Sequence, residues 1–320
     1  MVILLLLALL PRLADACQAG KARFDERSYT AAQELLWVCL GDNTEDKEVA
    51  HRLALTYREL KNYEDGIRRV ARLPNSVDRQ YLQAYLAFRT GNARDSLQIL
   101  EQAYRRDQAD WRIHQLFALN YIVLNIKEGA EASLENAIRL KPDNAELYYQ
   151  LARLYYNDNR PRESIQASRH ALTLFPDYPE VYDNLGLCHE ALAENDDAAR
   201  NYQKAIELNE KMHRKDEWPL LNYAAFLIRQ GQAGESLPLL NQAIKWNQRS
   251  AKAYYLLGRA FGKLGRNGEA KASLQQAIQL DGKEPAHYFE LGMLLQREGD
   301  RSGARANLAH FETLRKGAGR

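Results

Sequence analysis

The chain repeats itself with a period of about 34 residues. Its clearest mark is a column of Gly or Ala, namely Gly20, Ala54, Ala84, Ala118, Ala152, Gly186, Ala224, Gly258 and Gly292. Neighbouring members are 34 residues apart, except for 30 between Ala54 and Ala84 and 38 between Gly186 and Ala224. A second column of small residues lies twelve positions later, from Ala32 to Ala304. Nine copies of one unit predict a stacked array.

Each unit has the pattern of two helices joined by a turn. Around Ala152, for example, Tyr148, Leu151 and Tyr155 form an apolar stripe at helical spacing. Gly231 and its equivalents mark turns, and Pro74 and its equivalents end the second helices. Small residues in the column allow the two helices to approach closely. The fold class is therefore predicted to be all-α, an α-solenoid of about nine helix–turn–helix repeats.

The expected organisation has three parts: 1–16, a signal peptide; 17–315, the solenoid; and 316–320, a basic tail. We expect repeats to begin near residues 13, 47, 77, 111, 145, 179, 217, 251 and 285. The short spacing across Pro74 predicts a second helix that ends early. The long spacing across 209–216 predicts either a longer helix or a bulged loop, and neither is interpreted as a domain boundary.

The unit resembles the tetratricopeptide repeat. Residues 148–176, 182–208 and 254–282 carry that family's small and aromatic columns, and the resemblance extends over roughly 13–315. It implies a right-handed superhelix whose first helices line a concave groove. The set of basic and Asn residues with which some members bind a C-terminal carboxylate is not reproduced, although Arg153 and Asn184 lie at plausible positions.

The resemblance also implies candidate partner-binding residues on the groove stripe. Aromatic side chains offer rigid apolar contact, Asn can bond a peptide backbone, and Arg can hold a carboxylate. The alternative is that the aromatic residues only pack between repeats. The candidates are Tyr81, Tyr85, Phe88, Tyr149, Arg153, Tyr156, Asn184, Trp218, Asn222, Tyr255 and Arg259.

No catalytic pattern accompanies the repeats. The sequence has no HExxH, paired-Cys metal motif, phosphate loop or G-x-S-x-G. Lys and Arg exceed Asp and Glu by two, with the signs interspersed, so no basic face for nucleic acid is expected. We therefore expect a non-enzyme with no cofactor, metal, nucleic acid or small-molecule substrate.

The first residues predict export. Residues 2–10 are an apolar run of signal-peptide length, and Ala14-Asp15-Ala16 supplies a cleavage site before Cys17. Against this, no Lys or Arg precedes the run. The alternatives are an uncleaved apolar cap and a lipid-anchored form acylated at Cys17. A periplasmic or secreted protein is the favoured interpretation.

Cys17 and Cys39 are about equally distant from the turn of the first hairpin near Arg27. They should face each other at its open end, so we expect a Cys17–Cys39 disulfide in an oxidising compartment. The alternative is two unrelated small residues. Cys188 is expected to be a lone buried thiol.

These features predict a scaffold that binds a protein or peptide partner, as an extended segment or a helix, in the concave groove. The alternative is a structural or assembly module of a cell-envelope complex that acts through its ends or convex face. No polar capping helix is evident after the ninth repeat. This second hypothesis therefore includes a homodimer formed through the C-terminal repeat, at Phe311 and Leu314.

Overall fold

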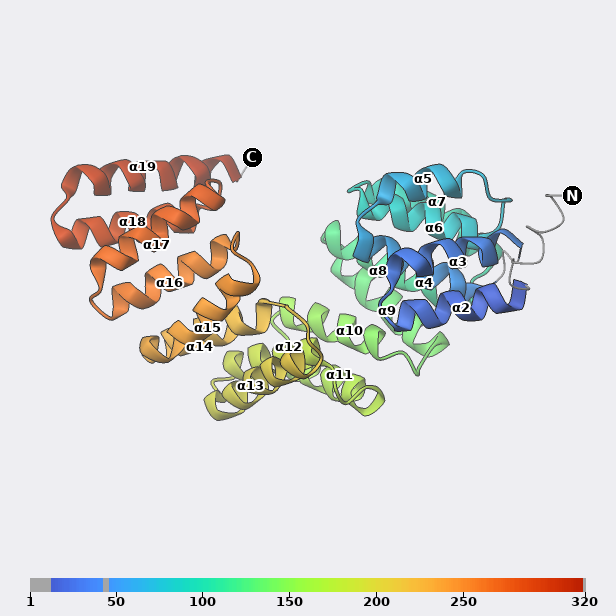
Figure 1. The fold of residues 1–320 in the computed structure, drawn as a ribbon, viewed down its shortest axis with the longest axis horizontal. Coiled ribbons are helices and arrows are strands. Elements are labelled where there is room, and N and C mark those ends of the chain that lie inside the picture. Colours follow the sequence, from blue (N-terminus) through green and yellow to red (C-terminus); the bar gives the residue numbers. More distant parts are fainter. Residues whose placement is uncertain (1–12, 43–45, 319–320) are drawn as a thin grey trace, which may run out of the picture. The chain divides into compact units, whose positions relative to one another are not determined.

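The computed structural model describes residues 13–42 and 46–318, and in these residues all regular elements are helices (Figure 1). Most of the predicted signal peptide, residues 1–12, lies outside the described residues, as does the end of the predicted tail. None of the described helices is both long and apolar enough to cross a membrane.

The described residues form nine helix pairs. The first helices are α2 (Leu13–Asp25), α4 (Lys47–Leu60), α6 (Val77–Arg89), α8 (Trp111–Val123), α10 (Ala145–Asn157), α12 (Pro179–Ala191), α14 (Trp218–Arg229), α16 (Ala251–Lys263) and α18 (Pro285–Glu298). The second helices are α3 (Tyr29–Asp42), α5 (Tyr63–Val70), α7 (Ala93–Arg106), α9 (Lys127–Leu140), α11 (Pro161–Leu174), α13 (Asn195–Lys211), α15 (Ala233–Trp246), α17 (Asn267–Leu280) and α19 (Arg301–Ala318). The predicted all-α repeat fold is confirmed.

The helices fall into two units, unit 1 (Met1–Leu154) and unit 2 (Tyr155–Arg320). The division lies inside α10, at neither of the two irregular repeat spacings. Within each unit, first helices pack on their own second helices, as α6 does on α7 and α12 on α13.

Local sequence sets where the helices begin and end. Asp46 caps α4 by accepting hydrogen bonds from the backbone N–H groups of Glu48 and Val49, and Ser76 caps α6 through that of Arg79. Gly231 has φ of 83° in the turn between α14 and α15. Only glycine adopts that backbone region without steric cost, so the turn is tight and the hairpin closes.

The column of small residues lies where paired helices come closest. A Cβ atom added at Gly186 would lie 2.6 Å from ring carbons of Tyr202, and one added at Gly258 would lie 2.6 Å from Leu274 Cγ. These separations are far below van der Waals contact. The column therefore repeats because each hairpin needs a position without a larger side chain.

The two irregular spacings have distinct structural causes. Helix α5 has 8 residues where most second helices have 14, which confirms the predicted early end. Helix α13 has 17 residues, so the longer spacing is absorbed by a helix that continues to Lys211 before the next repeat. Helix α19 also runs through Ala318, into the segment assigned to a tail.

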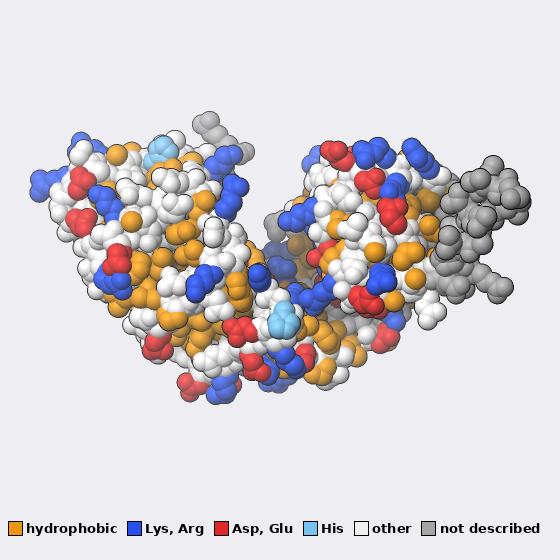
Figure 2. All heavy atoms as spheres, in the orientation of Figure 1, with side chains coloured by type: hydrophobic (Ala, Val, Ile, Leu, Met, Phe, Trp, Pro, Cys, Tyr) orange, Lys and Arg blue, Asp and Glu red, His pale blue; other side chains and the backbone are white. Residues whose placement is uncertain are grey.

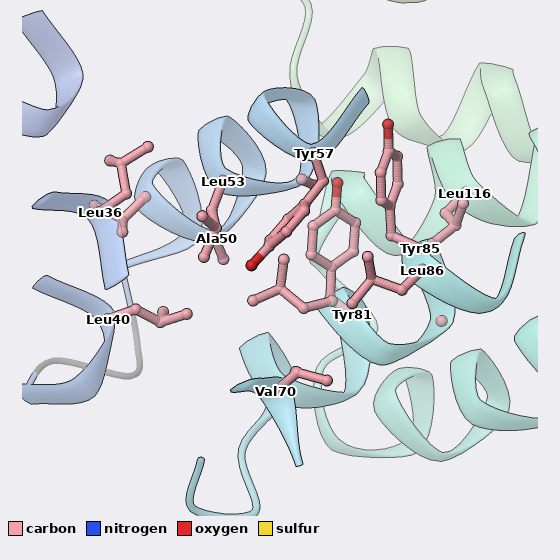
Figure 3. Packing of buried hydrophobic residues seen from close by; sticks show 14 of the residues in the cluster. Leu36, Leu40, Ala50, Leu53, Tyr57, Val70, Tyr81, Tyr85, Leu86 and Leu116 are labelled. Carbon is pink, nitrogen blue, oxygen red and sulfur yellow. The ribbon is translucent and has the colours of Figure 1, made fainter. Parts of the chain in front are cut away.

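The core of unit 1 is a layer of Leu, Ala and Tyr side chains between successive repeats (Figure 3). Tyr57, Tyr81 and Tyr85 reach between helices there, and Tyr57 accepts a hydrogen bond from Trp37 Nε1 at 2.8 Å. Each large ring can bury about 150–250 Å², so these tyrosines contribute strongly to the packing between repeats.

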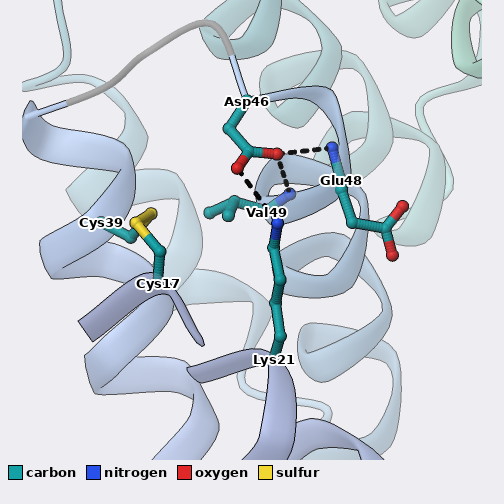
Figure 4. Close-up of a disulfide and its surroundings, with 6 residues drawn as sticks. All are labelled: Cys17, Lys21, Cys39, Asp46, Glu48 and Val49. Atoms are coloured by element: carbon teal, nitrogen blue, oxygen red, sulfur yellow. Dashed lines mark hydrogen bonds and ion pairs between the residues drawn. A yellow bond between two sulfur atoms is a disulfide. The ribbon is translucent and has the colours of Figure 1, made fainter. Parts of the chain in front are cut away.

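A disulfide joins the first two helices. Cys17 on α2 and Cys39 on α3 are bonded, with Cα atoms 5.0 Å apart, as the hairpin geometry predicts (Figure 4). Nearby, Lys21 pairs with Asp46 at 3.1 Å, and the same carboxylate caps α4. The disulfide thus joins the two helices of the first repeat, and the ion pair joins the first repeat to the second. Cys188 is a buried free thiol.

Candidate functional site

Four first helices of unit 1 line one groove of about 440 Å³, which we call the unit 1 groove. Most lining residues occupy three positions of each helix: three before, one after and four after the small-column residue. Positions at this spacing share one face of a helix. They are His51, Leu55 and Arg58 on α4; Tyr81, Tyr85 and Phe88 on α6; Gln115 and Leu119 on α8; and Tyr149 and Arg153 on α10. The others are Arg89, Leu116, Asn144, Glu146 and Gln150.

The floor of the groove is aromatic and fixed. Tyr81 and Tyr85 are only 2% and 6% exposed, with ring centroids 6.4 Å apart. The hydroxyl of Tyr81 lies 3.0 Å from His51 Nδ1, and the His51 ring packs edge-on against Trp111 at 4.8 Å. Phe88 is less buried and lies beside them. Tyr81 and Tyr85 therefore pack beneath the surface and hold the floor rigid, and Phe88 is the more accessible of these three rings.

Burial lowers the pKa of His51 to about 3, assisted by the positive charges of Arg112, Arg58 and Arg52. The imidazole is consequently neutral near pH 7 and acts as a hydrogen-bonding partner of Tyr81. It adds no charge to the groove.

The rim carries guanidinium groups. Arg89 donates from Nε and Nη2 to the hydroxyl of Tyr63, at 3.1 and 2.8 Å, and stacks over that ring. Arg153 lies over the ring of Tyr149, 5.9 Å from its centroid. Across the described part of the chain, neither pairs with a carboxylate. Arg58 does, donating to Glu59 at 2.8 Å.

The structure thus brings together five of the predicted partner-binding residues in one groove: Tyr81, Tyr85, Phe88, Tyr149 and Arg153. Sequence reasoning did not include His51, Leu55, Arg58 or Arg89. The first three occupy, in repeat 2, the same three positions that the predicted residues hold in repeat 3. Extending that register one repeat toward the N-terminus would have found them.

Asn184 requires a correction. It is 4% exposed, and its amide donates to Ser164 Oγ at 2.9 Å and Ser168 Oγ at 3.1 Å on α11. It lies two residues before the small-column Gly186, one position away from the groove register, and this turns it toward the preceding repeat. Asn184 therefore holds two repeats together and is not available to a partner.

The remaining candidates belong to unit 2 and have contacts of their own. Tyr156 packs against the cluster of Leu185 and Cys188. Asn222 donates to Asp183 at 2.8 Å, while Trp218 is 56% exposed at the start of α14.

Tyr255 and Arg259 are neighbours, with the guanidinium 5.7 Å from the ring centroid. Tyr255 also lines a hollow of about 290 Å³ beside His287. On the face drawn in Figure 2, hydrophobic side chains gather over α14 to α16, and Lys, Arg, Asp and Glu are interspersed elsewhere.

One group of potential metal ligands occurs in the described residues. Atoms of His189, Glu194 and Asp197 lie within 4.8 Å of one another. However, Glu194 already contacts His189 Nδ1 at 2.6 Å, and Asp197 pairs with Arg200. The group also surrounds the N-terminus of α13, whose partial positive charge opposes a cation. Nothing in this arrangement requires a metal.

Comparison with known families gives the repeat type. Sequence profiles described as tetratricopeptide repeat match residues 179–212 and 251–284, and another of the same description matches 127–183. A search of curated proteins gives no match.

Solved structures share the fold at low identity. A chain of the APC/C hetero-tetramer Cut9-Hcn1 aligns with TM-score 0.71 and 14% identity, over 83% of this chain and 52% of that one. This chain therefore spans about half the length of that relative. PilW, described as a type IV pilus biogenesis factor, aligns with TM-score 0.60 and 20% identity, over 68% and 98%. PilF of Pseudomonas aeruginosa aligns with TM-score 0.56 and 18% identity, over 66% and 94%. Residues 127–212 and 251–284 therefore match tetratricopeptide repeats, and the helix pairs together with these structures show an all-α solenoid fold of that type.

Proposed function

We propose that the protein is a non-catalytic scaffold that holds an extended segment or a helix of a protein partner in the unit 1 groove. The observation that carries this proposal is the groove itself, to which four successive repeats contribute residues in one register. Repeats of this type build protein-interaction scaffolds, and this surface has the composition of a binding site.

The physical argument concerns pre-organisation. Binding energy at protein interfaces is concentrated in a few aromatic and Arg residues that sit in well-packed surroundings. Phe88 and Tyr149 provide apolar surface, Gln115 and Gln150 provide amides, and these two amides already bond each other at 3.2 Å. Such a surface loses little conformational entropy when a partner binds.

We also propose that the protein works outside the cytoplasm. The Cys17–Cys39 disulfide is supporting evidence, because structural disulfides persist in oxidising compartments. Two structures of similar fold are named for pilus proteins, PilW and PilF, which agrees with an envelope location. A sulfur bonded to Cys39 cannot also form the thioether of a lipid anchor. The disulfide therefore favours a periplasmic or secreted form over acylation at Cys17.

A site-specific photo-crosslinker tests the groove. Replacement of Tyr149 by a photoreactive phenylalanine analogue should capture a defined partner segment in cells. The same analogue at Phe175, an exposed aromatic position of unit 2, is the control.

The segment captured is then made as a peptide for affinity measurements. Its affinity should fall at least about tenfold in the Phe88→Ala, Tyr149→Ala double variant, because two aromatic contacts are lost. Phe175→Ala should leave it unchanged. Equal capture from both positions, or unchanged affinity of the double variant, would contradict the proposal.

A second candidate function rests on the outer face of the last repeat. Ala304, Leu308 and Ala309 line a hollow of about 800 Å³ on α18 and α19. Apolar side chains at such a hollow can bury surface against a second copy of the chain. This hollow supports an assembly role, including a homodimer formed through α18 and α19.

Light scattering on the full chain tests this candidate. It predicts a dimer mass that returns to the monomer mass in Ala309→Glu, where Ala309 is exposed and its replacement does not disturb the core. A wild-type monomer at all concentrations would exclude the dimer.

A further inference from the structure

We propose that the segment bound in the unit 1 groove is acidic, with carboxylates that pair with Arg89 and Arg153 and an apolar side chain between them that contacts Phe88. This inference rests on the proposed function and specifies the chemistry of the partner. It follows from the charge of the lining, which contains three guanidinium groups and the carboxylate of Glu146.

Arg89 is held ready for an anion. Two of its five N–H groups donate to the hydroxyl of Tyr63, a neutral acceptor that leaves the positive charge uncompensated. The Tyr63 ring also supports the guanidinium plane from one side. An Arg oriented in this way loses less rotamer entropy when it binds a carboxylate than one that is unrestrained.

Arg153 has the same character on α10. Its guanidinium lies over the ring of Tyr149, and its side chain is exposed at the rim. An aromatic ring attracts a cation without neutralising it. Two guanidinium groups, for which the described residues provide no carboxylate partner, therefore border an apolar floor that is already packed.

The equivalent register positions of unit 2 have a different charge pattern. There Asp183 and Glu190 occupy the stripe on α12. Glu190 receives hydrogen bonds from Arg229, and Arg259 lies 3.8 Å from Glu290. Unit 2 thus compensates these charges within the protein. In the unit 1 groove, by contrast, the described residues give Arg89 and Arg153 no carboxylate partner.

A peptide fits these features better than a nucleic acid does. Single-stranded nucleic acids are usually bound by a basic channel that follows many phosphates. The unit 1 groove offers only two guanidinium groups that lack a carboxylate partner within residues 13–42 and 46–318, and the whole chain has a formal charge of +2. Arg is well suited to bidentate pairing with a carboxylate, and Phe88 suits an apolar side chain between two such pairs.

Fluorescence anisotropy on the full oxidised chain tests the inference. The probes are a labelled peptide of Glu residues around a central Phe, the same peptide with Gln for Glu, and a short oligothymidylate. We expect the Glu peptide to bind at least about tenfold tighter than the Gln peptide, since a hydrogen bond between two charged groups is stronger than one from a guanidinium to a neutral amide. The preference should weaken as salt is added.

Variants assign the effect to the two arginines. Arg89→Gln with Arg153→Gln should abolish the preference for Glu, whereas Arg200→Gln, which removes an exposed guanidinium of unit 2, should preserve it. Absence of Glu-peptide binding up to millimolar concentration, equal binding of the Glu and Gln peptides, or tighter binding of oligothymidylate would each overturn the inference.

The same measurements separate this inference from the proposed function. If Phe88→Ala weakens the Glu and Gln peptides equally while the arginine variant changes neither, the groove binds peptides and only the acidic preference is wrong. If neither variant alters the binding of any peptide, both the inference and the role of the groove fail.

Discussion

The guanidinium of Arg112 lies 2.6 Å from a carboxylate oxygen of Asp78, at a position where both side chains are almost completely buried. Arg112 also donates to both oxygens of Asp110, which precedes it by two residues, and to the backbone oxygen of Lys47. Its plane stacks over Tyr81, 4.7 Å from the ring centroid. One cation thus joins α4, α6 and α8 beneath the groove, in the region where α5 ends early.

Removal of this cation should be costly. Arg112→Ala leaves the carboxylates of Asp78 and Asp110 buried together without a positive charge, and loss of one partner of a buried pair typically costs about 3–5 kcal/mol. Urea denaturation followed by circular dichroism measures the change in the free energy of unfolding.

Two comparisons interpret that measurement. Arg200→Ala breaks an exposed pair, with the Arg side chain 67% exposed, and should cost less than about 1 kcal/mol. Asp78→Asn added to Arg112→Ala should recover part of the loss, because it removes a buried negative charge. Burial raises the pKa of Asp78, and Arg112 is the first of the groups that oppose this rise. A loss under about 1 kcal/mol in Arg112→Ala would show that the carboxylates find other compensation.

The pH dependence of stability should carry a contribution from His51. Its folded-state pKa is lowered to about 3, whereas an unfolded histidine titrates near 6.5. Between these values the unfolded chain binds a proton that the folded chain excludes, so the free energy of unfolding falls as the pH falls. The expected slope is about 1 kcal/mol per pH unit.

Urea denaturation of wild type and His51→Gln at pH 7 and pH 5 isolates this contribution. The difference in the free energy of unfolding between wild type and His51→Gln should change by about 1–2 kcal/mol against the wild type as the pH falls from 7 to 5. Parallel pH profiles of the two proteins would mean that folding leaves the pKa of His51 unchanged, so that the folded protein takes up this proton as readily as the unfolded chain.

The repeat fold could be predicted from sequence because close helix packing leaves a direct trace in residue size. Gly186 faces Tyr202 and Gly258 faces Leu274, so the small column reports a contact that every hairpin must make. The short α5 could be anticipated for a similar reason, since Pro74 and a spacing of 30 residues leave too little chain for a full helix.

The groove was less accessible to sequence reasoning. Its position on the first helices is a matter of register, and an error of one residue rotates a side chain by about 100°. Asn184 lies one position off that register and is buried against Ser164 and Ser168. Sequence also does not reveal whether an arginine is paired. Arg89 and Arg229 hold equivalent positions, but among the residues that the structure describes only Arg229 has a carboxylate partner, Glu190.

Gly186→Ala should destabilise the protein more than an ordinary Gly→Ala change. The new Cβ would lie 2.6 Å from the Tyr202 ring, whose hydroxyl is bonded to Glu190 and which packs against Tyr223 and Phe226 at 5.8 Å. The ring has no space to move, so overpacking should cost about 1–3 kcal/mol.

Gly234→Ala is the matched control for Gly186→Ala. A Cβ at Gly234 in α15 meets nothing within 4 Å, and alanine favours a helix over glycine by about 1 kcal/mol. That variant should be neutral or slightly more stable. Thermal melts compare the two, and equal melting temperatures would indicate that the hairpin of α12 and α13 can widen at no cost.

Reduction should weaken the first repeat selectively. The Cys17–Cys39 bond closes a segment with a sequence separation of 22, for which loss of the unfolded-state constraint amounts to about 3 kcal/mol. Titration of thiols in denatured protein should give one per chain before reduction, from Cys188, and three after it. In the native state Cys188 should react slowly, because burial raises the pKa of its thiol to about 11.

Hydrogen exchange then locates the effect of reduction. The amides of α2 and α3 should lose protection in the reduced protein or in Cys17→Ser, whereas those of α16 and α17 in unit 2 should not change. Loss of protection in both units would mean that the first repeat stabilises the whole chain, and three reactive thiols before reduction would mean that the bond is not formed. If the bond is formed only in protein recovered from an oxidising compartment, its presence in native material also reports where the chain resides.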